Sequence, residues 1–458
     1  MGLSIVILAA GEGSRMYSDI PKVLHPVGGT PMLAHVVNTA RQLDDVRVLV
    51  VYGHGGQTVP EALSHLPVSW VEQAAQLGTG HAVQQTLGYL EADDTVLVLY
   101  GDVPLIRAET LQRLLEQVDE TTLALLTVHL EEPAGYGRII RDEAAQVIAI
   151  VEDRDASVAE RGIAEVNTGI LAVKEGILKH CLDALENNNA QREYYLTDII
   201  ARCVAEGLRI MTTSPDSPVE VMGVNNRQQL AQVERHFQQR QAACLMQAGV
   251  NLQDPTRFDL RGGLHAGRDV TIDINVIISG EVKLGDRVSI GPNVVIHNSI
   301  IGDDTSILAN CVIEDAVVGE NCQIGPFARL RPETELQKNA RVGNFVEIKK
   351  SSIGRGSKIN HLSYIGDTTV GCDVNIGAGT ITCNYDGANK HRTEIGDRAF
   401  IGSDSQLVAP VKIGAGATIG AGSTITRDAP ADELTLSRAQ QQTRTGWTRP
   451  VKKLKKES

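Results

Sequence analysis

The chain has 458 residues. This is too many for a single hydrophobic core, so we expect two or three domains. Its formal net charge of −13 argues against a nucleic-acid-binding surface, because such surfaces need basic patches. Aromatic residues make up only 3% of the chain while glycines number 44, a combination that favours a repetitive β architecture.

The first apolar run, residues 5–8, predicts a buried parallel strand that leads into a glycine-rich turn. Gly11 and Gly13 leave room for the backbone to pass close to a phosphate chain, and their N–H groups can cradle an anion. Arg15 and Lys22 would supply the positive charge that a triphosphate needs. The spacing fits neither the dinucleotide fingerprint nor the P-loop, and an ordinary strand–turn–helix unit can also hold two glycines.

Residues 1–226 alternate strand-like runs with amphipathic segments, which predicts an α/β domain with a Rossmann-like, mostly parallel sheet. The further predicted strands are residues 46–51, 95–100, 123–128 and 169–173. Ligands of such sheets bind at the carboxyl ends of the strands, and Asp102 falls at one of these ends. An aspartate in this place is also often only a helix cap.

Residues 227–248 carry no strand signal and are predicted to form a linker helix with a structural role. Apolar residues nearly trace one face of it, and Gly249 is a plausible stop. The residues of that face are Leu230, Val233, Phe237, Gln241 and Leu245.

From about residue 250 to 427 the chain is a repeat in which an aliphatic residue precedes a glycine, mostly at spacings of six or multiples of six. A hexapeptide period predicts a parallel β-helix, in which eighteen residues close one triangular coil. These glycines are Gly285, Gly291, Gly319, Gly325, Gly343, Gly354, Gly366, Gly371, Gly377, Gly396, Gly402, Gly414 and Gly420. We assign residues 249–458 to this second domain, including its tail. The period breaks at residues 382–392, which we expect to form a polar loop pushed out of a coil and to mark function.

Three further features concern the environment of the chain. Its seven cysteines form no C-x-x-C pair, so we expect neither a disulfide framework nor a zinc site, and a reducing cytoplasm is the simplest location. The short N-terminal apolar run does not predict a signal peptide, and no segment approaches membrane-span length. The basic residues 449–456 are expected to be solvated, with contact to a CoA phosphate or to a membrane surface as the alternative.

His361 lies inside the repeat, at a position where an aliphatic residue would be ordinary. An isolated histidine is more often structural, but Arg331, Lys349 and Lys350 form a cationic cluster on an otherwise acidic chain, as a sugar phosphate requires. Histidine can act as a general base near neutral pH, so catalysis is the alternative to a structural role for His361.

Residues 8–16, followed by Pro21 and Lys22, resemble the signature of sugar-1-phosphate nucleotidyltransferases. With the helix and the repeat behind them, they resemble the family of bifunctional N-acetylglucosamine-1-phosphate uridylyltransferases / glucosamine-1-phosphate N-acetyltransferases. Local matches at residues 77–82, 341–347 and 377–387 extend the resemblance over the whole chain. It implies synthesis of UDP-N-acetylglucosamine for the cell envelope, a left-handed β-helix, and a cytoplasmic homotrimer whose acetyl sites lie between subunits. Nucleic acid and stable membrane insertion are not expected.

The resemblance also assigns a uridylyltransferase site. Attack by an already ionised phosphate oxygen on the α-phosphorus of UTP needs no general base, so catalysis is positioning and charge neutralisation. The resemblance implies Mg²⁺ held by Asp102 and Asn225, with Lys22 neutralising phosphates and Arg15 assisting the departing pyrophosphate. Binding of UTP and UDP-N-acetylglucosamine is expected at Leu8, Ala9, Ala10, Gly11, Lys22, Gln73, Gly78, Thr79, Tyr100, Gly101, Asp102, Gly137, Glu152, Asn167 and Asn225. Two residues depart from the family pattern: Ser14 replaces a threonine, and Glu12, where a basic residue is frequent, is expected to face solvent.

For the acetyltransferase site the resemblance implies that His361 is the general base. Glu347 is a candidate for orienting the base or the amine. The expected glucosamine-1-phosphate contacts are Arg331, Lys349, Tyr364 and Asn375. The expected acetyl-CoA contacts are Ala378, Asn384, Tyr385, Ser403, Ala421 and Arg438.

Two alternatives remain beside this bifunctional enzyme. One is a single-function sugar-1-phosphate nucleotidyltransferase whose β-helix is structural or regulatory, against which Arg331, Lys349 and His361 argue together. The other is a non-catalytic nucleotide-binding scaffold, which the presence of Lys22 and Asp102 disfavours.

Overall fold

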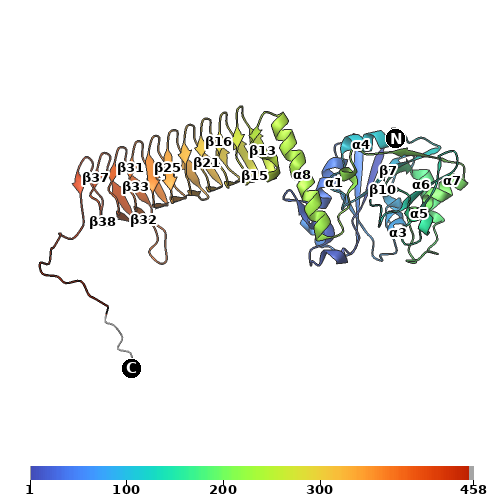
Figure 1. The fold of residues 1–458 in the computed structure, drawn as a ribbon, viewed down its shortest axis with the longest axis horizontal. Coiled ribbons are helices and arrows are strands. Elements are labelled where there is room, and N and C mark those ends of the chain that lie inside the picture. The colour runs from blue at the N-terminus through green and yellow to red at the C-terminus, as the bar shows by residue number, and fades with distance from the viewer. Residues whose placement is uncertain (1, 453–458) are drawn as a thin grey trace, which may run out of the picture. The chain divides into compact units, whose positions relative to one another are not determined.

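The computed structural model describes residues 2–452, which fall into two compact units divided between Ala243 and Cys244. The helix α8, Arg227–Gln247, is continuous through this division (Figure 1). The predicted division into two domains and a linker, with boundaries at residues 226 and 248, stays a prediction.

Within the described residues, the first unit is built on one nine-stranded sheet with the strand order β11-β7-β10-β6-β1-β4-β5, to which β8 and β9 add a hairpin. The strands are β1 Leu3–Leu8, β4 Val46–Tyr52, β5 Ser69–Glu72, β6 Thr95–Tyr100, β7 Thr122–His129, β8 Arg138–Arg141, β9 Val147–Val151, β10 Glu165–Lys174 and β11 Arg209–Thr213, with a separate pair β2 Pro26–Val27 and β3 Thr30–Pro31. The helices are α1 Met32–Ala40, α2 Thr58–Ala62, α3 Thr79–Gln84, α4 Ala108–Leu115, α5 Val158–Arg161, α6 Glu175–Asp183 and α7 Asp198–Ala205, with 3₁₀ turns η1 Ser14–Met16, η2 Lys22–Leu24, η3 Leu87–Tyr89 and η4 Pro218–Val221.

The sheet confirms the predicted fold class, and each predicted strand lies in an observed one. Strand β1 is buried on both faces, because Ile5 and Ile7 enter one core while Val6 and Leu8 enter the other. Such two-sided burial is what a continuous apolar run in a parallel sheet provides.

Strand β10 differs from a purely parallel arrangement, because it runs antiparallel to both β6 and β7. The chain leaves β7 at His129 and re-enters β10 at Glu165, directly opposite. Since the intervening hairpin β8–β9 brings the chain back to the same end of the sheet, no crossover is made and the pair is antiparallel.

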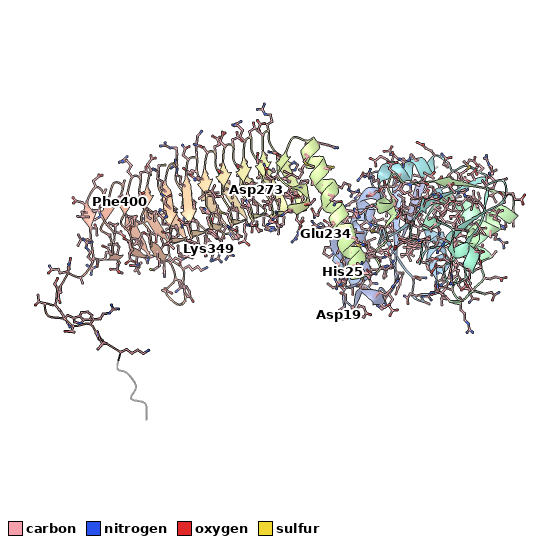
Figure 2. All side chains as sticks on the ribbon, viewed as in Figure 1. Asp19, His25, Glu234, Asp273, Lys349 and Phe400 are labelled. Atoms are coloured by element: carbon pink, nitrogen blue, oxygen red, sulfur yellow. The ribbon has the colours of Figure 1, made fainter. Side chains whose placement is uncertain are left out.

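Helix α8 packs on the first unit through Val233 and Phe237, which join a small core with Met16, Val27 and Met32. A side chain at Gly28 would collide with the ring of Phe237, whose Cε1 would lie 2.1 Å from the added Cβ. Glu234 accepts a hydrogen bond from the Gly28 N–H at 2.7 Å (Figure 2). Of the five residues predicted for the apolar face, Val233 and Phe237 are buried, while Leu230, Gln241 and Leu245 are only half-buried.

The second unit is a parallel β-helix, which confirms the prediction from the hexapeptide period. In the described residues its strands form two ladders. The first holds β12 Asn251–Leu252, β14 Thr271–Ile272, β16 Ser289–Ile290, β19 Ser306–Ile307, β22 Gln323–Ile324, β25 Arg341–Asn344, β28 Lys358–His361, β31 Asn375–Ile376, β34 Phe400–Ile401, β37 Thr418–Ile419 and β39 Leu434–Thr435.

The second ladder winds over the remaining faces. It holds β13 Phe258–Ala266, β15 Val276–Leu284, β17 Val295–His297, β18 Ile300–Ile301, β20 Val312–Glu314, β21 Ala316–Val318, β23 Arg329–Leu330, β24 Thr334–Leu336, β26 Glu347–Lys349, β27 Ser352–Ile353, β29 Tyr364–Gly366, β30 Thr368–Val370, β32 Ile381–Cys383, β33 Thr393–Ile395, β35 Gln406–Val408, β36 Val411–Ile413 and β38 Thr424–Ile425.

The repeat glycines are required because successive coils approach closely. A Cβ at Gly343 would lie 2.0 Å from the carbonyl oxygen of Asn360 in the next coil. The aliphatic residue of each repeat points inward instead, and Val342, Ile359 and Ile376 stack in register and are buried.

The register confirms a loop at the predicted break but corrects its start, because Thr382 and Cys383 belong to β32 and pair with the next coil. Ile359 pairs with Ile376, but Ile376 pairs with Ile401, so the coil between the last two is longer than its neighbours. The additional residues leave the stack beside β32 as a loop (Figure 1). This places residues 384–392 outside the coils, where they are available to cover the adjacent face.

Two predictions concern the ends and the surface. The basic segment 449–456 lies partly outside the described residues, which end at 452. Among the helices of the described chain, none combines the length and apolar character that crossing a membrane demands.

Candidate active sites

A cavity of about 720 Å³ opens at the carboxyl end of β1, β4 and β6, where ligands of parallel sheets bind. Eleven of the residues predicted for nucleotide binding line it. These are Leu8, Ala9, Ala10, Gly11, Lys22, Gln73, Gly78, Thr79, Tyr100, Asp102 and Asn225.

The glycine-rich turn gives the two glycines different functions. A Cβ at Gly11 would meet nothing within 4 Å, so this backbone borders open space inside the cavity lining. Gly13 has a φ of +66°, and a Cβ there would lie 2.7 Å from the Cβ of Lys22. Gly13 therefore admits Lys22 to the site, whereas Gly11 leaves the space that a phosphate chain could occupy.

The predicted metal ligands converge on one cation. The Lys22 ammonium donates to the Asp102 carboxylate, and its Nζ lies 3.2 Å from Oδ1 of Asn225. The side chains of Lys22 and Asp102 are 13% and 16% exposed. The Asn225 segment is fixed to the strand end because the Val224 N–H donates to the Asp102 carbonyl at 3.0 Å.

The three residues predicted to meet the sugar lie together, although they do not line the cavity. The Asn167 N–H donates to the Gly137 carbonyl at 2.8 Å, and a Cβ at Gly137 would lie 3.6 Å from Oε1 of Glu152. Burial raises the pKa of Glu152, and Thr197 donates a hydrogen bond to it at 2.9 Å. The pKa of Tyr100 is raised mainly by burial and, to a smaller extent, by the negative charge of Glu152. Tyr100 also lines the cavity, so it lies between the cavity and the sugar residues.

The segment 193–197 builds the wall of the cavity, and sequence reasoning missed it. The Tyr194 N–H donates to the Leu77 carbonyl at 2.8 Å, and the Leu196 N–H donates to Oγ1 of Thr79 at 3.1 Å. Glu193 lines the cavity, as do His54 and Gln76. His54 follows β4 in a glycine-rich turn, a signal that would have found it, whereas nothing local in the sequence marks Glu193.

The remaining predicted residues of this turn are exposed. Arg15 lies in η1 and does not line the cavity, so in this state it is not beside the phosphate space. Glu12 is exposed, as expected, but sits at the cavity mouth. Gly101 lies beneath the turn, because its N–H donates to the Leu8 carbonyl at 2.9 Å.

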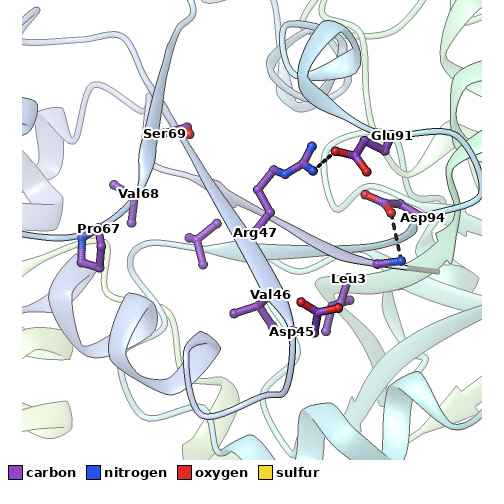
Figure 3. Close-up of a pocket in the computed structure, with 11 residues that line it drawn as sticks. Leu3, Asp45, Val46, Arg47, Pro67, Val68, Ser69, Glu91 and Asp94 are labelled. Atoms are coloured by element: carbon purple, nitrogen blue, oxygen red, sulfur yellow. Dashed lines mark hydrogen bonds and ion pairs between the residues drawn. The ribbon is translucent and has the colours of Figure 1, made fainter.

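A second cavity, of about 600 Å³, opens at the amino ends of the same strands (Figure 3). Three of its charged side chains have partners: Arg47 pairs with Glu91, and Asp94 accepts from Oγ of Ser4 at 2.6 Å and from the Gly2 N–H at 3.2 Å. This edge lies away from the strand ends that carry the predicted chemistry.

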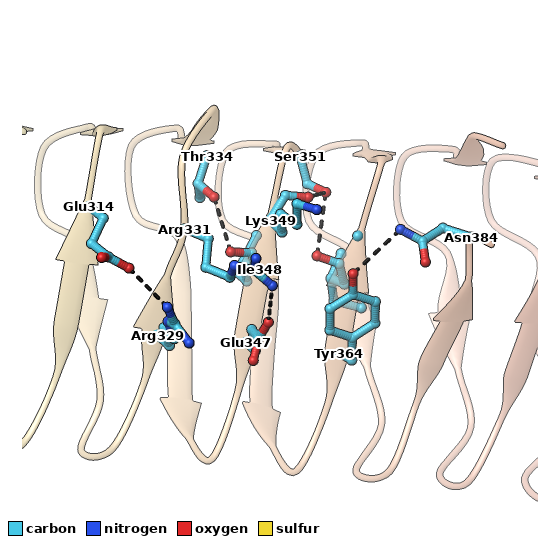
Figure 4. Close-up of polar contacts among 12 residues, drawn as sticks. Glu314, Arg329, Arg331, Thr334, Glu347, Ile348, Lys349, Ser351, Tyr364 and Asn384 are labelled. Atoms are coloured by element: carbon cyan, nitrogen blue, oxygen red, sulfur yellow. Dashed lines mark hydrogen bonds and ion pairs between the residues drawn. The ribbon is translucent and has the colours of Figure 1, made fainter. Parts of the chain in front are cut away.

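In the second unit, two of the three predicted cations, Arg331 and Lys349, lie on one face of successive coils (Figure 4). The third, Lys350, pairs instead with Glu333, whose Oε2 lies 3.6 Å from its Nζ. Arg331 follows β23 and donates to Oε1 of Glu347 at 2.8 Å, while Lys349 ends β26 beside Gly366 in β29. Tyr364 begins β29, directly opposite Glu347. Coil stacking therefore turns residues far apart in sequence into a compact cluster.

Lys390 joins this cluster from the extruded loop and was not predicted. The neighbouring Lys390 ammonium lowers the pKa of Lys349, and the Arg331 guanidinium lowers it further. Three cations thus gather on this face, where Arg331 pairs with Glu347 and Asp367 is the carboxylate that acts on Lys349, and such a cluster is suited to a phosphate. Only the position of the loop reveals this, because Lys390 is 41 residues away from Lys349 along the chain.

His361 ends β28 and is oriented by the preceding coil. Its Nδ1 lies 2.9 Å from Oδ1 of Asn344, which pairs with it in register. An amide oxygen accepts only, so Nδ1 carries the proton and Nε2 keeps its lone pair. Asn375 lies in β31, the strand next to β28.

The residues predicted for acetyl-CoA form a column toward the end of the repeat. The Asp404 N–H donates to the Ala378 carbonyl, and the Gly422 N–H donates to the Ser403 carbonyl at 2.8 Å. Arg438 donates to the Ala421 carbonyl at 2.9 Å.

Two residues of the loop complete the predicted set. Asn384 donates to the Asp367 carboxylate and lies 3.4 Å from the Tyr364 hydroxyl, whereas Tyr385 is 60% exposed. Beside Lys390, the loop therefore reaches this face through Asn384, while Tyr385 is presented to solvent.

Family models match both units. Residues 5–168 match the MobA-like NTP transferase domain, residues 261–336 the GMPPB C-terminal domain, and residues 392–427 the bacterial transferase hexapeptide (six repeats). A nucleotidyl transferase from Methanothermobacter thermautotroptrophicus is similar with a TM-score of 0.39 and 20% identity, over 52% of this chain and 97% of that chain.

Two curated relatives match nearly the whole chain. It is 58% identical over 459 residues to the Bifunctional protein GlmU of Methylococcus capsulatus, covering 100% of this chain and 99% of that protein. It is 59% identical over 451 residues to the Bifunctional protein GlmU of Cellvibrio japonicus, covering 98% of this chain and 100% of that protein. The chain belongs to the bifunctional GlmU family.

As a member of the GlmU family, the chain is a bifunctional transferase. Its repeat domain acetylates glucosamine-1-phosphate with acetyl-CoA, and its N-terminal domain transfers uridylyl from UTP to N-acetylglucosamine-1-phosphate with release of pyrophosphate. The single-function alternative with a structural β-helix finds no support.

Proposed function

We propose that the two residue clusters described above are the two active sites, and that each reaction is carried out by its own unit. The observation that carries this assignment is positive charge in both places: Lys22 in the nucleotide cavity, and the cluster of Arg331, Lys349 and Lys390 on the β-helix. Both substrates are phosphorylated hexoses, which an acidic chain binds only where positive charge is concentrated.

In the uridylyltransferase site, the glycine-rich turn positions the triphosphate and Lys22 neutralises it, so that the sugar phosphate oxygen attacks the α-phosphorus in line. Gly137, Glu152 and Asn167 orient the sugar. The attacking oxygen is already an anion, so no side chain is assigned as base. Arg15, which is exposed in this state, is retained as a proposal for assisting pyrophosphate release.

The Mg²⁺ that the family implies fits this site. An ammonium already lies between the Asp102 carboxylate and the Asn225 amide oxygen, and these are the oxygen types that Mg²⁺ prefers. Bound there, Mg²⁺ supplies charge stabilisation for the phosphates. Within residues 2–452 no group of three or more His, Cys, Asp or Glu is arranged for a metal, so only these two side chains are assigned as ligands.

In the acetyltransferase site, Arg331, Lys349 and Lys390 bind the phosphate of glucosamine-1-phosphate. The Nε2 lone pair of His361 accepts the proton that the amine loses as its nitrogen bonds to the acetyl carbon. The thioester C–S bond breaks in this step, and the departing CoA thiolate takes the proton from the His361 imidazolium and leaves as the thiol. The column Ala378, Ser403, Ala421 and Arg438 is proposed to hold acetyl-CoA.

We further propose that the enzyme is a homotrimer joined through one edge of the β-helix. At this edge successive coils place Phe327, Phe345 and Leu362 outward, 49%, 56% and 62% exposed. The two phenyl rings stack with centroids 5.2 Å apart. Leu362 directly follows His361, so a second copy that covers this apolar edge also encloses the base, which supports acetyl sites between subunits.

Location and pathway remain proposals of the same kind. All seven cysteines are free thiols, and the buried Cys181 and Cys203 stay unbonded with their Sγ atoms 3.4 Å apart. Reduced thiols support a cytoplasmic enzyme. Its product would serve cell-envelope synthesis, as the resemblance implies.

One assay tests the assignment. Purified protein is incubated with glucosamine-1-phosphate, acetyl-CoA, UTP and Mg²⁺, and free thiol, pyrophosphate and UDP-N-acetylglucosamine are measured. We expect all three products from the wild-type chain. Release of thiol that persists in Arg331→Met/Lys349→Met would contradict the proposed acetyl site.

A further inference from the structure

Lys22 occupies the place between the two oxygens that are proposed to bind the metal. It donates to Asp102 and lies 3.2 Å from Oδ1 of Asn225. Its backbone is fixed at the start of η2, because the Leu24 N–H donates to the Pro21 carbonyl at 2.9 Å and Gly13 packs on its Cβ. The flexible side chain is therefore the part of Lys22 that can move.

Both cations cannot hold these oxygens together. A divalent ion ligated by a carboxylate and an amide oxygen lies about 2.1 Å from each, within the volume that the ammonium now fills. The side chains are mostly buried, so water screens the repulsion between the two cations poorly.

The cavity offers the ammonium an alternative partner. Lys22 and Gly11 line the same space, and nothing fills the position of a Gly11 side chain. A phosphate chain bound there would accept the hydrogen bonds that Lys22 now gives to Asp102 and Asn225.

We propose that Lys22 is a stand-in cation that competes with the metal for Asp102 and Asn225 and gives way when nucleotide phosphates draw it aside. This rests on the proposed function, because it takes those two residues as the metal ligands. Lys22 then weakens metal binding by the free enzyme and couples metal binding to nucleotide binding. If Lys22 only neutralised phosphates, its removal would not tighten metal binding by the nucleotide-free enzyme.

The test is titration of the nucleotide-free full chain with Mn²⁺, followed by electron paramagnetic resonance of the free ion. We expect Lys22→Met to bind Mn²⁺ about tenfold more tightly than the wild type, the scale of a charge-assisted hydrogen bond removed. The matched control is Lys179→Met, which removes the same charge from an exposed position on α6 and should leave affinity within about twofold. Lys22→Gln provides a second uncharged variant.

The outcomes separate this inference from the proposed site. Unchanged or weaker Mn²⁺ binding by both Lys22 variants overturns the competition, while loss of binding in Lys22→Met/Asp102→Asn still supports the metal ligands. Tight binding that survives Asp102→Asn overturns the metal site and the competition together. Because the two units are separate, folding of the first unit is checked directly, by the thermal unfolding and circular dichroism of every variant against the wild type.

Discussion

The Nδ1 atom of His361 lies 2.9 Å from Oδ1 of Asn344, one coil earlier in the β-helix. An amide oxygen only accepts, so Nδ1 is the donor in this contact, and Nε2 is the ring nitrogen left for the proposed role as acceptor of the amine proton. Asn344 acts through His361 and is a positioning residue for acetyl transfer.

Asn344→Ala should lower kcat for acetyl transfer by about 10- to 100-fold, since a general base contributes about 10²–10⁴ and its orientation a part of that. Asn344→Asp should retain more activity but move the acid limb of the pH–kcat profile to higher pH, because a carboxylate favours the protonated imidazole. Asn321→Ala is the control, since the Asn321 amide contacts Asn339 elsewhere on the helix. An unshifted profile in Asn344→Asp would argue against the contact.

Lys390→Met should have two effects on acetyl transfer. The KM for glucosamine-1-phosphate rises, because one phosphate-binding cation is lost. Since the Lys390 ammonium lowers the pKa of Lys349, its removal raises that pKa, and the rise of KM at alkaline pH should begin at higher pH than in the wild type. Lys412→Met, which breaks a surface pair with Glu394, is the control. A KM that rises without movement of the alkaline limb would place Lys390 away from Lys349.

The two activities should fail separately. Asp102→Ala should abolish uridylyl transfer and leave acetyl transfer near wild type, and His361→Ala should do the reverse, because each site lies in its own compact unit. Thiol release and pyrophosphate release, measured on the same preparation, check this. Loss of both activities in a folded single variant would show that the units depend on each other.

Phe345→Glu should convert the proposed trimer to smaller species, because a charge would replace a ring stacked in the exposed apolar edge. Acetyl transfer should fall with trimer content, while uridylyl transfer persists. Light scattering after size-exclusion chromatography measures the mass. Val317→Glu, at a residue 48% exposed on another face of the coils, should remain trimeric; dissociation of this control would show that the edge is not the interface.

Gly169→Ala should impair the sugar side of the uridylyltransferase site. Gly169 has a φ of +82°, and a Cβ would lie 2.4 Å from Cε2 of Tyr100. The variant should lose about 1–3 kcal/mol of stability through backbone strain. By displacing Tyr100 it should raise the KM for N-acetylglucosamine-1-phosphate more than that for UTP. Equal changes in both constants would indicate a general loss of folding instead.

Much of this molecule could be predicted because its signals are local. The strand before Gly11 and the hexapeptide period each depend on neighbouring residues, and the break at residues 382–392 is visible as an interruption of that period. The resemblance then supplied residue roles that spacing alone does not carry, such as the pairing of Asp102 with Asn225.

What could not be predicted depends on register and on chain reversal. Successive coils contain 17 or 18 residues, as Ile296, Ile313, Leu330 and Ile348 show, so the partner of His361 cannot be counted from the period. The approach of Lys390 to Lys349 needs the path of the loop. The antiparallel direction of β10 follows from where the β8–β9 hairpin returns, which no local pattern encodes.

The edge that carries Phe327, Phe345 and Leu362 changes chemistry along the axis, because the same corner in the earlier coils holds Asn293 and Asn310, whose amides hydrogen-bond to each other. If a second copy of the β-helix were shifted by one coil along the axis, a phenyl ring would face the asparagine amides. Because apolar and polar corners follow one another along the axis, copies of the proposed trimer can pack in only one axial register. Each His361 then lies at the same height against the surface of its neighbour.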